Sequence, residues 1–285
     1  MKERIKRAKI LIDALPYIKE FRGKTFVIKY GGNAMIDEKL KKNVILDFLL
    51  LHYVGIKIVI IHGGGPAISK TMKKMNLVPQ FIDGHRITDR ETLSVAEMVL
   101  TGQVNKEIVS LLNKNGGKAV GLSGKDGFLI KAKKKKGKYD LGYVGEVESV
   151  NPEIIRVLEE NGFITVISPI GIDENGETYN INADTVAAHI AGALNAEKFF
   201  LLTDVDGILR NVNDKNSLIS SINYKDIEKL EKEGVISGGM IPKVEACKIA
   251  LCKGAKKAHI INGTTPHAIL LETFTTKGIG TQICK

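Results

Sequence analysis

The sequence contains no tryptophan, and only 6% of its 285 residues are aromatic. Proteins that bind single-stranded nucleic acids usually stack the bases on aromatic side chains, and here these are scarce although the formal net charge is +10. Much of the lysine excess lies in one run, KAKKKKGKYD at residues 131–140, which is typical of a solvated hairpin. We therefore expect no nucleic-acid partner, although the charge alone keeps a basic nucleic-acid-binding protein as an alternative.

Cysteine is also rare: Cys247, Cys252 and Cys284 are the only three, and they form no CxxC motif. An odd number without close spacing indicates free thiols in a reducing cytoplasm. No apolar run approaches the roughly 18 residues of a membrane helix, and Asp13 and Pro16 interrupt the basic N-terminal stretch too early for a signal peptide. We expect a cytoplasmic protein that does not bind membranes.

The common nucleotide-binding motifs are missing. A GxGxxG fingerprint would need glycine at position 68 after Gly63 and Gly65, but Ile68 stands there. The GK pairs at 23–24 and 124–125 lack the preceding glycine of a P-loop. If this protein binds a nucleotide, it does so with a different fold.

What the chain does contain is a regular alternation of apolar runs and amphipathic runs. Continuous apolar runs favour the strands of a parallel sheet covered on both faces, and they lie at 26–29, 57–61, 118–122, 163–167, 198–202 and 258–261. Helical periodicity falls between them, at 39–54, 66–75, 90–114, 152–160, 183–194, 222–233 and 242–253. This pattern predicts an α/β fold, namely a three-layer αβα sandwich with a mainly parallel, open central sheet.

Some segments fall outside this alternation. Apolar residues at helical spacing predict an N-terminal helix within residues 1–22, kinked near Pro16. Segments 133–143 and 172–182 each turn at glycine and are typical of hairpins inserted in the fold. We place a boundary near residue 178, which divides the remaining chain into an N-lobe (23–178) and a C-lobe (179–285).

Two glycine-rich loops follow predicted strands, and parallel sheets bind ligands at the carboxyl ends of their strands. In FVIKYGGNAM, the strand ends at Lys29 and glycines 31–32 follow. In IVIIHGGGPAI, the strand leads to glycines 63–65, and Pro66 follows at a suitable first position of a helix. Three glycines exceed what a tight turn between strand and helix requires, so an anion site at the helix N-terminus is favoured over that alternative.

Two further signals are charged residues near helix starts. In YNINADTVAAHIAGA, Asn182 is a good N-cap and Asp184 lies in the first turn, where a carboxylate suits the helix dipole. Capping alone would explain both residues. In VISGGMIPKVEA, Pro242 begins a helix and Lys243 lies in its first turn, where a cation opposes the dipole. A local rule broken beside a glycine loop is a reason to expect function.

Lys29, Lys243 and Asp184 together are suited to phosphoryl transfer, which needs mainly positioning and positive charge around the transferred group. One lysine near the attacking oxygen and one near the leaving oxygen would supply the charge, and the carboxylate would hold both in place. An acceptor that is itself a carboxylate needs no general base, because it is already ionised at pH 7. His62 and His85 flank the loops as supporting groups, and the other four histidines are expected in packing or surface positions.

Six segments in this order carry a resemblance that covers nearly the whole chain: IKYGGNAM, IIHGGGPAI, DGHRITD, NINADTVAAHIAGAL, LLTDVDGI and GGMIPKVEAC. Together they resemble the acetylglutamate kinases of the amino-acid kinase family. The resemblance implies the amino-acid kinase fold, with the acetylated amino acid bound in the N-lobe and ATP in the C-lobe. It also implies Mg²⁺ held mainly by the phosphate oxygens of the nucleotide, without a dedicated set of protein ligands.

The resemblance assigns roles residue by residue. Lys29 and Lys243 match the lysines that stabilise the transition state, and Asp184 matches the aspartate that organises them. The residues implied to bind the acetylated substrate are Gly64, Gly65, Arg86 and Asn180. Those implied to lie along the nucleotide are Gly31, Gly32, Gly63, Thr203, Asp204, Val205, Asp206, Gly207, Ile208, Val235, Ile236 and Ser237. One departure is His85, where many relatives have an apolar residue.

The N-terminal helix resembles that of family members inhibited by arginine, in which it links dimers into a ring-shaped hexamer. The C-terminal segment LLETFTTKGIGTQI resembles them too. The implied effector site contains Glu272 as guanidinium partner, Tyr17 from the helix, and backbone groups around Gly278 and Gly280. A capped C-terminal helix followed by a final strand is the alternative. A homo-oligomer, either a dimer or a hexamer of three dimers, is therefore expected, and a small regulatory protein is a further candidate partner.

The predicted function is ATP-dependent phosphorylation of the γ-carboxylate of N-acetyl-L-glutamate in arginine biosynthesis, with arginine as feedback inhibitor. Alternatives within the family are kinases of acetylated aminoadipate, carbamate or a nucleoside monophosphate. A catalytically silent sensor of nucleotide or arginine is an alternative of another class, which intact Lys29, Asp184 and Lys243 disfavour.

Overall fold

The computed structural model describes residues 1–285, apart from the side chain of Arg7. The helices are α1 (Lys2–Phe21), α2 (Glu38–Tyr53), α3 (Gly65–Lys74), α4 (Arg90–Glu97), α5 (Asn105–Lys114), α6 (Glu153–Glu160), α7 (Ala183–Ala193), α8 (Ile227–Lys232), α9 (Ile241–Lys253) and α10 (Ala268–Phe274). The strands are β1 (Thr25–Tyr30), β2 (Lys57–His62), β3 (Phe81–Ile82), β4 (His85–Arg86), β5 (Ala119–Ser123), β6 (Ile130–Lys134), β7 (Val144–Val150), β8 (Ile164–Ser168), β9 (Ile170–Ile172), β10 (Thr178–Ile181), β11 (Lys198–Thr203), β12 (Ser221–Asn223), β13 (Lys257–Asn262) and β14 (Thr281–Cys284).

Eight strands form the central sheet in the order β12-β14-β13-β11-β1-β2-β8-β5. All neighbouring pairs are parallel except β13 with β14. Strand β1 lies in the middle, with Lys29 in register with Leu201 of β11 and Ile61 of β2. The predicted α/β fold is confirmed, and the carboxyl ends of β1, β2 and β11 meet at one edge of the sheet.

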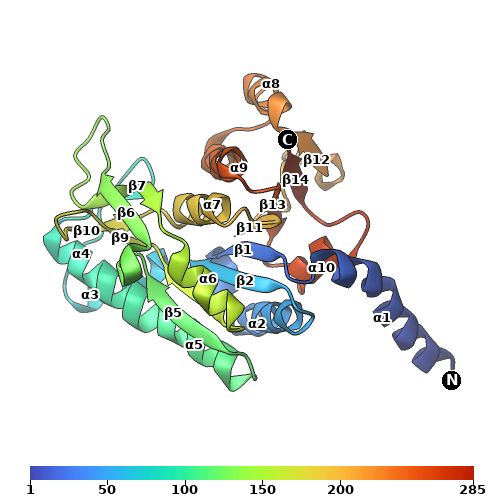
Figure 1. Cartoon of the computed structure of the whole chain (residues 1–285). Helices are drawn as coiled ribbons and strands as arrows, with labels where there is room; N and C mark the ends of the chain where they lie inside the picture. The colour runs from blue at the N-terminus through green and yellow to red at the C-terminus, as the bar shows by residue number, and fades with distance from the viewer.

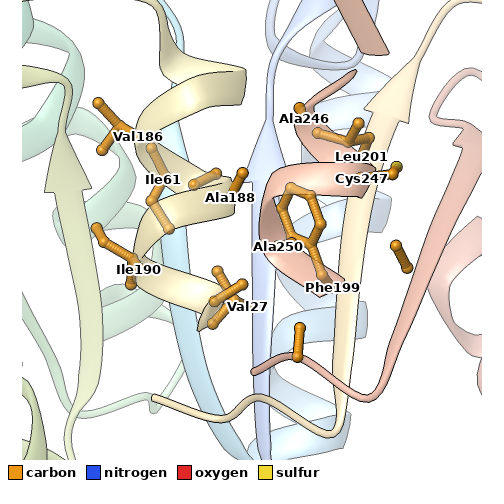
Figure 2. Close-up of a cluster of buried hydrophobic side chains, with 14 of the residues drawn as sticks. Val27, Ile61, Val186, Ala188, Ile190, Phe199, Leu201, Ala246, Cys247 and Ala250 are labelled. Atoms are coloured by element: carbon orange, nitrogen blue, oxygen red, sulfur yellow. The ribbon is translucent and has the colours of Figure 1, made fainter. Parts of the chain in front are cut away.

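Helices cover both faces of this sheet, as Figure 1 shows with α7 on one side of β1 and β2 and α2 on the other. Alternate residues of each strand point to opposite faces. Val27 of β1 packs with α7 and α9, while its neighbours Phe26 and Ile28 pack with α2 and α10. In Figure 2, Val27, Ile61 and Leu201 of the sheet lie against side chains of α7 and α9. The three layers thus enclose two apolar cores.

The two predicted hairpins are present, and they combine into a unit that the sequence did not predict. Strands β6 and β7 pair antiparallel, as do β9 and β10. The four strands close into a small barrel in the order β10-β7-β6-β9. Its lysine run is solvated as expected, and part of it is neutralised across the hairpin, where Lys133 Nζ lies 3.3 Å from Glu146 Oε1.

Two predicted helices differ from the structure. The segment expected as one helix over 90–114 is α4, a π-helical stretch η2 (Met98–Val104) and α5. The segment expected as helix over 222–233 begins instead as β12, because buried Ile222 pairs with β14, and Asn223 then accepts the Lys225 N–H to start a short 3₁₀ turn before α8.

Helix α1 projects from the body at the N-terminus (Figure 1). Pro16 lies inside it. It touches the body near its C-terminal end, where the rings of Tyr17 and buried Phe21 make edge contacts with Phe274 and Phe26 at 6.4 and 5.4 Å. Several apolar side chains nearer its start are more than half exposed: Ile5, Ile10, Leu11 and Ile12. Among the described residues, no helix is both long and apolar enough to cross a bilayer. The lobe boundary near residue 178 stays a prediction.

Candidate active site

Lys29 and Asp184 meet at the carboxyl edge of the sheet. Lys29 lies near the end of β1, and Asp184 lies in the first turn of α7, whose N-cap Asn182 accepts hydrogen bonds from the N–H groups of Asp184 and Thr185 at 2.9 and 3.1 Å. The Lys29 Nζ to Asp184 Oδ1 distance is 2.9 Å, and each side chain is only 17% exposed. The cap and the helix start therefore hold the carboxylate where it fixes the ammonium group.

The first glycine loop leaves space for charged groups. A Cβ atom at Gly31 would lie 2.7 Å from Lys29 Nζ. Gly32 has a φ of +68°, and a Cβ there would lie 2.8 Å from an Asp204 carboxylate oxygen. The Asn33 N–H donates to the same carboxylate at 2.9 Å. This loop thus joins β1 to the loop that follows β11.

The second glycine loop forms the open start of α3. Gly64 is its N-cap, and a Cβ there would lie 2.5 Å from Leu100 Cδ2, so close packing excludes a side chain. A Cβ at Gly65 would meet nothing within 4 Å. His62, at the end of β2, is fully buried, and its Nδ1 lies 2.8 Å from the Gly63 carbonyl oxygen. Burial lowers the pKa of His62 to about 4, so the ring is neutral near pH 7.

Arg86 on β4 lies beside this loop. Its Nη2 donates to the Gly65 carbonyl at 3.0 Å and to Ser69 Oγ at 2.8 Å, and the guanidinium stacks over Phe81 at 4.7 Å. It is 8% exposed, and burial lowers its pKa. Guanidinium groups remain charged even so. A cation is therefore held at the glycine loop, and Ser69 and Phe81, which position it, carried no signal in the sequence.

Asn180 lies on β10, where its backbone N–H donates to the Tyr143 carbonyl at 3.0 Å. It is half-buried and pairs with Ile170 of β9. Asn180 thus comes from the small barrel, two residues before the cap of α7 that positions Asp184.

Lys243 lies in the first turn of α9 as predicted, and its Nζ donates to the Gly239 carbonyl at 3.3 Å. Among the described residues it forms no ion pair, so the structure joins Lys29 to Asp184 but does not join Lys243 to them. Helices α7 and α9 pack against each other. Burial and then the charge of Asp184 raise the pKa of the Cys247 thiol. Cys247 is one turn beyond Lys243, so this face of α9 is directed towards Asp184.

The residues expected along the nucleotide surround the carboxyl ends of β11 and β13. Thr203 Oγ1 donates to the Val205 carbonyl at 3.0 Å, and Asp206 accepts from Asn262 Nδ2 at 2.7 Å. Gly207 adopts a φ of +140° before buried Ile208. The other expected nucleotide residues, Val235, Ile236 and Ser237, precede the 3₁₀ turn that leads into α9. Ile208 and Ile236 are buried, and the backbone N–H and carbonyl of Ile208 already bond to Thr281 Oγ1 and the Ile219 N–H.

Three of the four residues expected to bind arginine, all except Gly280, line one separate cavity of about 770 Å³ between α1, α10 and the edge of the sheet. Tyr17, Glu272 and Gly278 line it, together with Lys198 and His259, which the sequence did not identify. Glu272 accepts from Ile279 N–H at 2.6 Å and from Gly280 N–H at 3.1 Å.

His259 completes the surroundings of Glu272. Its Nδ1 lies 2.7 Å from Glu272 Oε1, and the pair is almost fully buried. Burial alone would raise the pKa of Glu272, but these hydrogen bonds hold it below its usual value. A carboxylate has about four lone-pair sites, so one remains for a ligand in the cavity.

Comparisons with known proteins identify the family of this chain. The amino acid kinase family model matches residues 24–262, and the chain therefore belongs to the amino acid kinase family. Within it, the chain groups with the acetylglutamate kinases: that of Archaeoglobus fulgidus is 54% identical over 288 residues, which are 98% of this chain and 99% of the relative.

Two solved structures extend the comparison. N-acetylglutamate synthase from Neisseria gonorrhoeae, complexed with coenzyme A and N-acetyl-glutamate, matches with a TM-score of 0.84 and 26% identity over 98% of this chain. The same synthase complexed with coenzyme A and L-arginine gives 0.82 and 25%, again over 98% of this chain. This chain spans 63% and 65% of those two chains, respectively.

Proposed function

We propose that this protein transfers the γ-phosphoryl group of ATP to the γ-carboxylate of N-acetyl-L-glutamate, as a cytoplasmic enzyme of arginine biosynthesis. The observation that carries the proposal is the Lys29–Asp184 pair at the carboxyl edge of the sheet, where both glycine loops begin. The full-length similarity to acetylglutamate kinases supports this substrate over acetylated aminoadipate or carbamate.

In the proposed reaction, a γ-carboxylate oxygen forms a bond to the γ-phosphorus while the bond from phosphorus to the β-phosphate oxygen breaks, and ADP leaves. Lys29 faces the transferred group, and Lys243 approaches the leaving oxygen from α9. Asp184 holds Lys29 in place. Positive charge that is already oriented lowers the barrier, because it needs no reorganisation as negative charge shifts.

Arg86 binds the α-carboxylate of the acceptor, since a guanidinium can donate two parallel hydrogen bonds to a carboxylate. Gly64 and Gly65 offer backbone N–H groups at the open start of α3. Asn180 binds the acetylated amino acid from the opposite side. These groups place the acceptor next to Lys29.

The nucleotide lies along residues 203–208 and 235–237, with glycines 31, 32 and 63 around its phosphates. The space for the nucleotide is supported by two unobstructed glycines shortly before α9, because a Cβ at Gly238 or Gly239 would meet nothing within 4 Å. Among the described residues there is no cluster of three His, Cys, Asp or Glu that could hold a metal. Phosphate oxygens would therefore hold Mg²⁺, which supplies charge neutralisation when bound.

The test is to measure ADP release and hydroxylamine-trapped acyl phosphate with N-acetylglutamate, N-acetylaminoadipate and glutamate, and ADP release with carbamate. We expect kcat/KM to be highest for N-acetylglutamate, with product formation dependent on Mg²⁺. Activity with N-acetylglutamate that does not exceed activity with the other acceptors would reject the assignment.

We further propose that arginine inhibits the enzyme from the cavity around Glu272, and that α1 joins dimers into a hexamer. The cavity has a buried carboxylate for a guanidinium and is bounded by α1 through Tyr17. The exposed apolar side chains of α1 need a cover, which a second copy of the helix would supply. Glu272→Gln should raise the arginine concentration for half inhibition at least about tenfold while kcat is unchanged.

A further inference from the structure

Asn105 is a buried polar residue that the proposed chemistry does not use. It begins α5 directly after the π-helical stretch η2, and it is 1% exposed. Asn105 lies on the same helix face as buried Ile108 and Leu112. A polar side chain on an apolar helix face requires hydrogen-bond partners, and π-helical turns often occur at functional sites.

The amide nitrogen of Asn105 contacts the ends of three neighbouring strands. Its Nδ2 donates to the Val166 carbonyl of β8 at 3.0 Å and to the Leu122 carbonyl of β5 at 3.3 Å. It also lies 3.2 Å from His62 Nε2 at the end of β2. Since carbonyl oxygens only accept, the NH₂ group and not the oxygen must face this side.

The contacts on both sides of the ring determine the tautomer of His62. The Gly63 carbonyl can only accept, so Nδ1 of the neutral ring carries the proton, and Nε2 keeps the lone pair that faces the Asn105 amide. Nδ1 faces the Gly63 carbonyl at 2.8 Å, which accepts it. The lowered pKa of His62 is consistent with this neutral form.

The bond to Gly63 has a consequence for the loop. In a trans peptide the carbonyl and the following N–H point in opposite directions. Holding the Gly63 carbonyl towards His62 therefore turns the Gly64 N–H away from it. Leu100 of the π-helical stretch packs against Gly64 and restricts the same peptide.

We propose that Asn105 is a positioning residue that acts through His62 to orient the Gly63–Gly64 peptide for binding the acceptor. The inference rests on the proposed function only for the identity of that acceptor. The chain from Asn105 to His62 to Gly63 is independent of which carboxylate is bound.

Asn113 offers a matched control on the same helix. Its side chain also joins α5 to β5, because Nδ2 donates to the Ala119 carbonyl at 3.2 Å and Oδ1 accepts the Ala119 N–H at 2.7 Å. This contact lies at the opposite end of β5, away from His62. Asn113→Ala should thus reproduce a loss of packing without the effect on the loop.

The experiment combines steady-state kinetics with nitrogen NMR of the His62 ring in the free protein. For Asn105→Ala we expect KM for N-acetylglutamate to rise about 10- to 100-fold, as expected for a misplaced hydrogen bond to a charged group, with KM for ATP changed less than about twofold. Asn113→Ala should lower Tm and leave both KM values unchanged. In the wild type, Nδ1 should be protonated and Nε2 should not; in Asn105→Ala both tautomers should appear.

A wild-type His62 protonated at Nε2 would overturn the proposal, and so would Asn105→Ala with the wild-type KM for N-acetylglutamate. If the alanine variant does not fold, Asn105→Ser replaces it, since a serine hydroxyl is too short to reach all three strands. A wild-type enzyme without N-acetylglutamate kinase activity would instead reject the proposed function, and the His62 spectrum would still decide the role of Asn105.

Discussion

Lys29, at the end of β1, carries a charge whose position is restricted by its surroundings. Its ammonium group is held by Asp184 on one side, and on the other a side chain at Gly31 would collide with it. The two constraints leave few orientations for Nζ. A lysine held in this way does not need to reorganise during the reaction.

Removing this charge should therefore affect rate rather than folding. We expect Lys29→Ala to lower kcat by at least about 10²-fold, comparable to the loss of one oriented donor, with little change in Tm. Lys24→Ala is the control, because Lys24 precedes the same strand and makes only an exposed contact of 4.0 Å with Glu197. Equal kcat values for the two variants would contradict a role for Lys29.

Lys243 gives a second prediction at the residue scale. Lys243→Ala should also lower kcat by at least about 10²-fold, although its contact in the free protein is only the Gly239 carbonyl. Lys248→Ala, on the same helix and paired with Glu245 at 3.3 Å, should keep the wild-type rate. A nearly wild-type kcat in Lys243→Ala would remove this lysine from the mechanism.

Such residues differ in how far the sequence could predict them. Asp184 and Lys243 were visible because capping and dipole rules apply within one helix turn. The 2.9 Å contact between Lys29 and Asp184 was only a hypothesis, because a distance between residues so far apart depends on strand order. Asn105 carried a weak signal, a polar residue at the spacing of apolar Ile108 and Leu112, but its partners lie on three other strands.

At the scale of elements, α2 and α10 are joined by an ionisable pair of which only the Asp47 carboxyl is buried. Asp47 on α2 is fully buried, and its Oδ1 lies 2.6 Å from Nδ1 of His267, which precedes α10. Among the described residues, Asp47 Oδ2 forms no hydrogen bond of ordinary geometry, although the Ile269 N–H acts to lower the pKa of the carboxyl. Burial raises the pKa of Asp47 to about 6, although the hydrogen bond with His267 acts in the opposite direction.

This junction predicts a pH dependence of stability. A carboxyl whose pKa is higher in the folded protein stabilises it below its ordinary pKa of about 4, and the contribution is lost as the pH rises through about 6. The free energy of unfolding of the wild type, relative to Asp47→Asn, should therefore fall between pH 4 and pH 7, by at most about 3 kcal/mol. Urea unfolding at several pH values measures it, and a constant difference would contradict the prediction.

The sequence predicted helices and strands well where apolar periodicity extends over many residues. It predicted them less well where a single local contact determines the secondary structure. The segment expected as one helix over 90–114 is helical throughout, but a π-helical stretch, in which Leu100 lies against Gly64, interrupts the α-helix. Ile222 fits a helical pattern, yet it forms a strand because β14 offers a free edge. The two hairpins of the barrel were each predictable alone. Their pairing with each other was not, because it depends on tertiary contacts.

At the scale of the whole molecule, α1 projects from the rest of the chain (Figure 1). Its apolar side chains at Ile10 and Leu11 are 59% and 73% exposed. It reaches the cavity around Glu272 only at its C-terminal end, through Tyr17, Glu20 and Phe21. One helix could thus take part in both assembly and inhibition.

Deleting residues 1–20 should convert the proposed hexamer into dimers and abolish inhibition by arginine, with kcat retained, since the catalytic residues lie elsewhere. Sedimentation velocity and arginine titration measure the two effects. Leu11→Glu should also disrupt the hexamer, whereas Lys6→Glu, on the same helix, serves as the polar control. A deletion variant that remains hexameric and inhibited would refute both roles of α1.

The central position of β1 in the sheet also determines when the sheet can be completed during synthesis. Val27 pairs on one side with Val59 of β2, which the ribosome delivers soon afterwards, and on the other with Phe199 of β11, which is synthesised much later. Until then, a nascent chain holds a partly built sheet with an apolar, unpaired edge, the kind of species that aggregates and recruits chaperones. The Lys29–Asp184 pair also depends on a late segment, because Asp184 lies on α7. A chain stalled before α7 would contain the glycine loops for the acceptor, but it would have no phosphoryl-transfer chemistry.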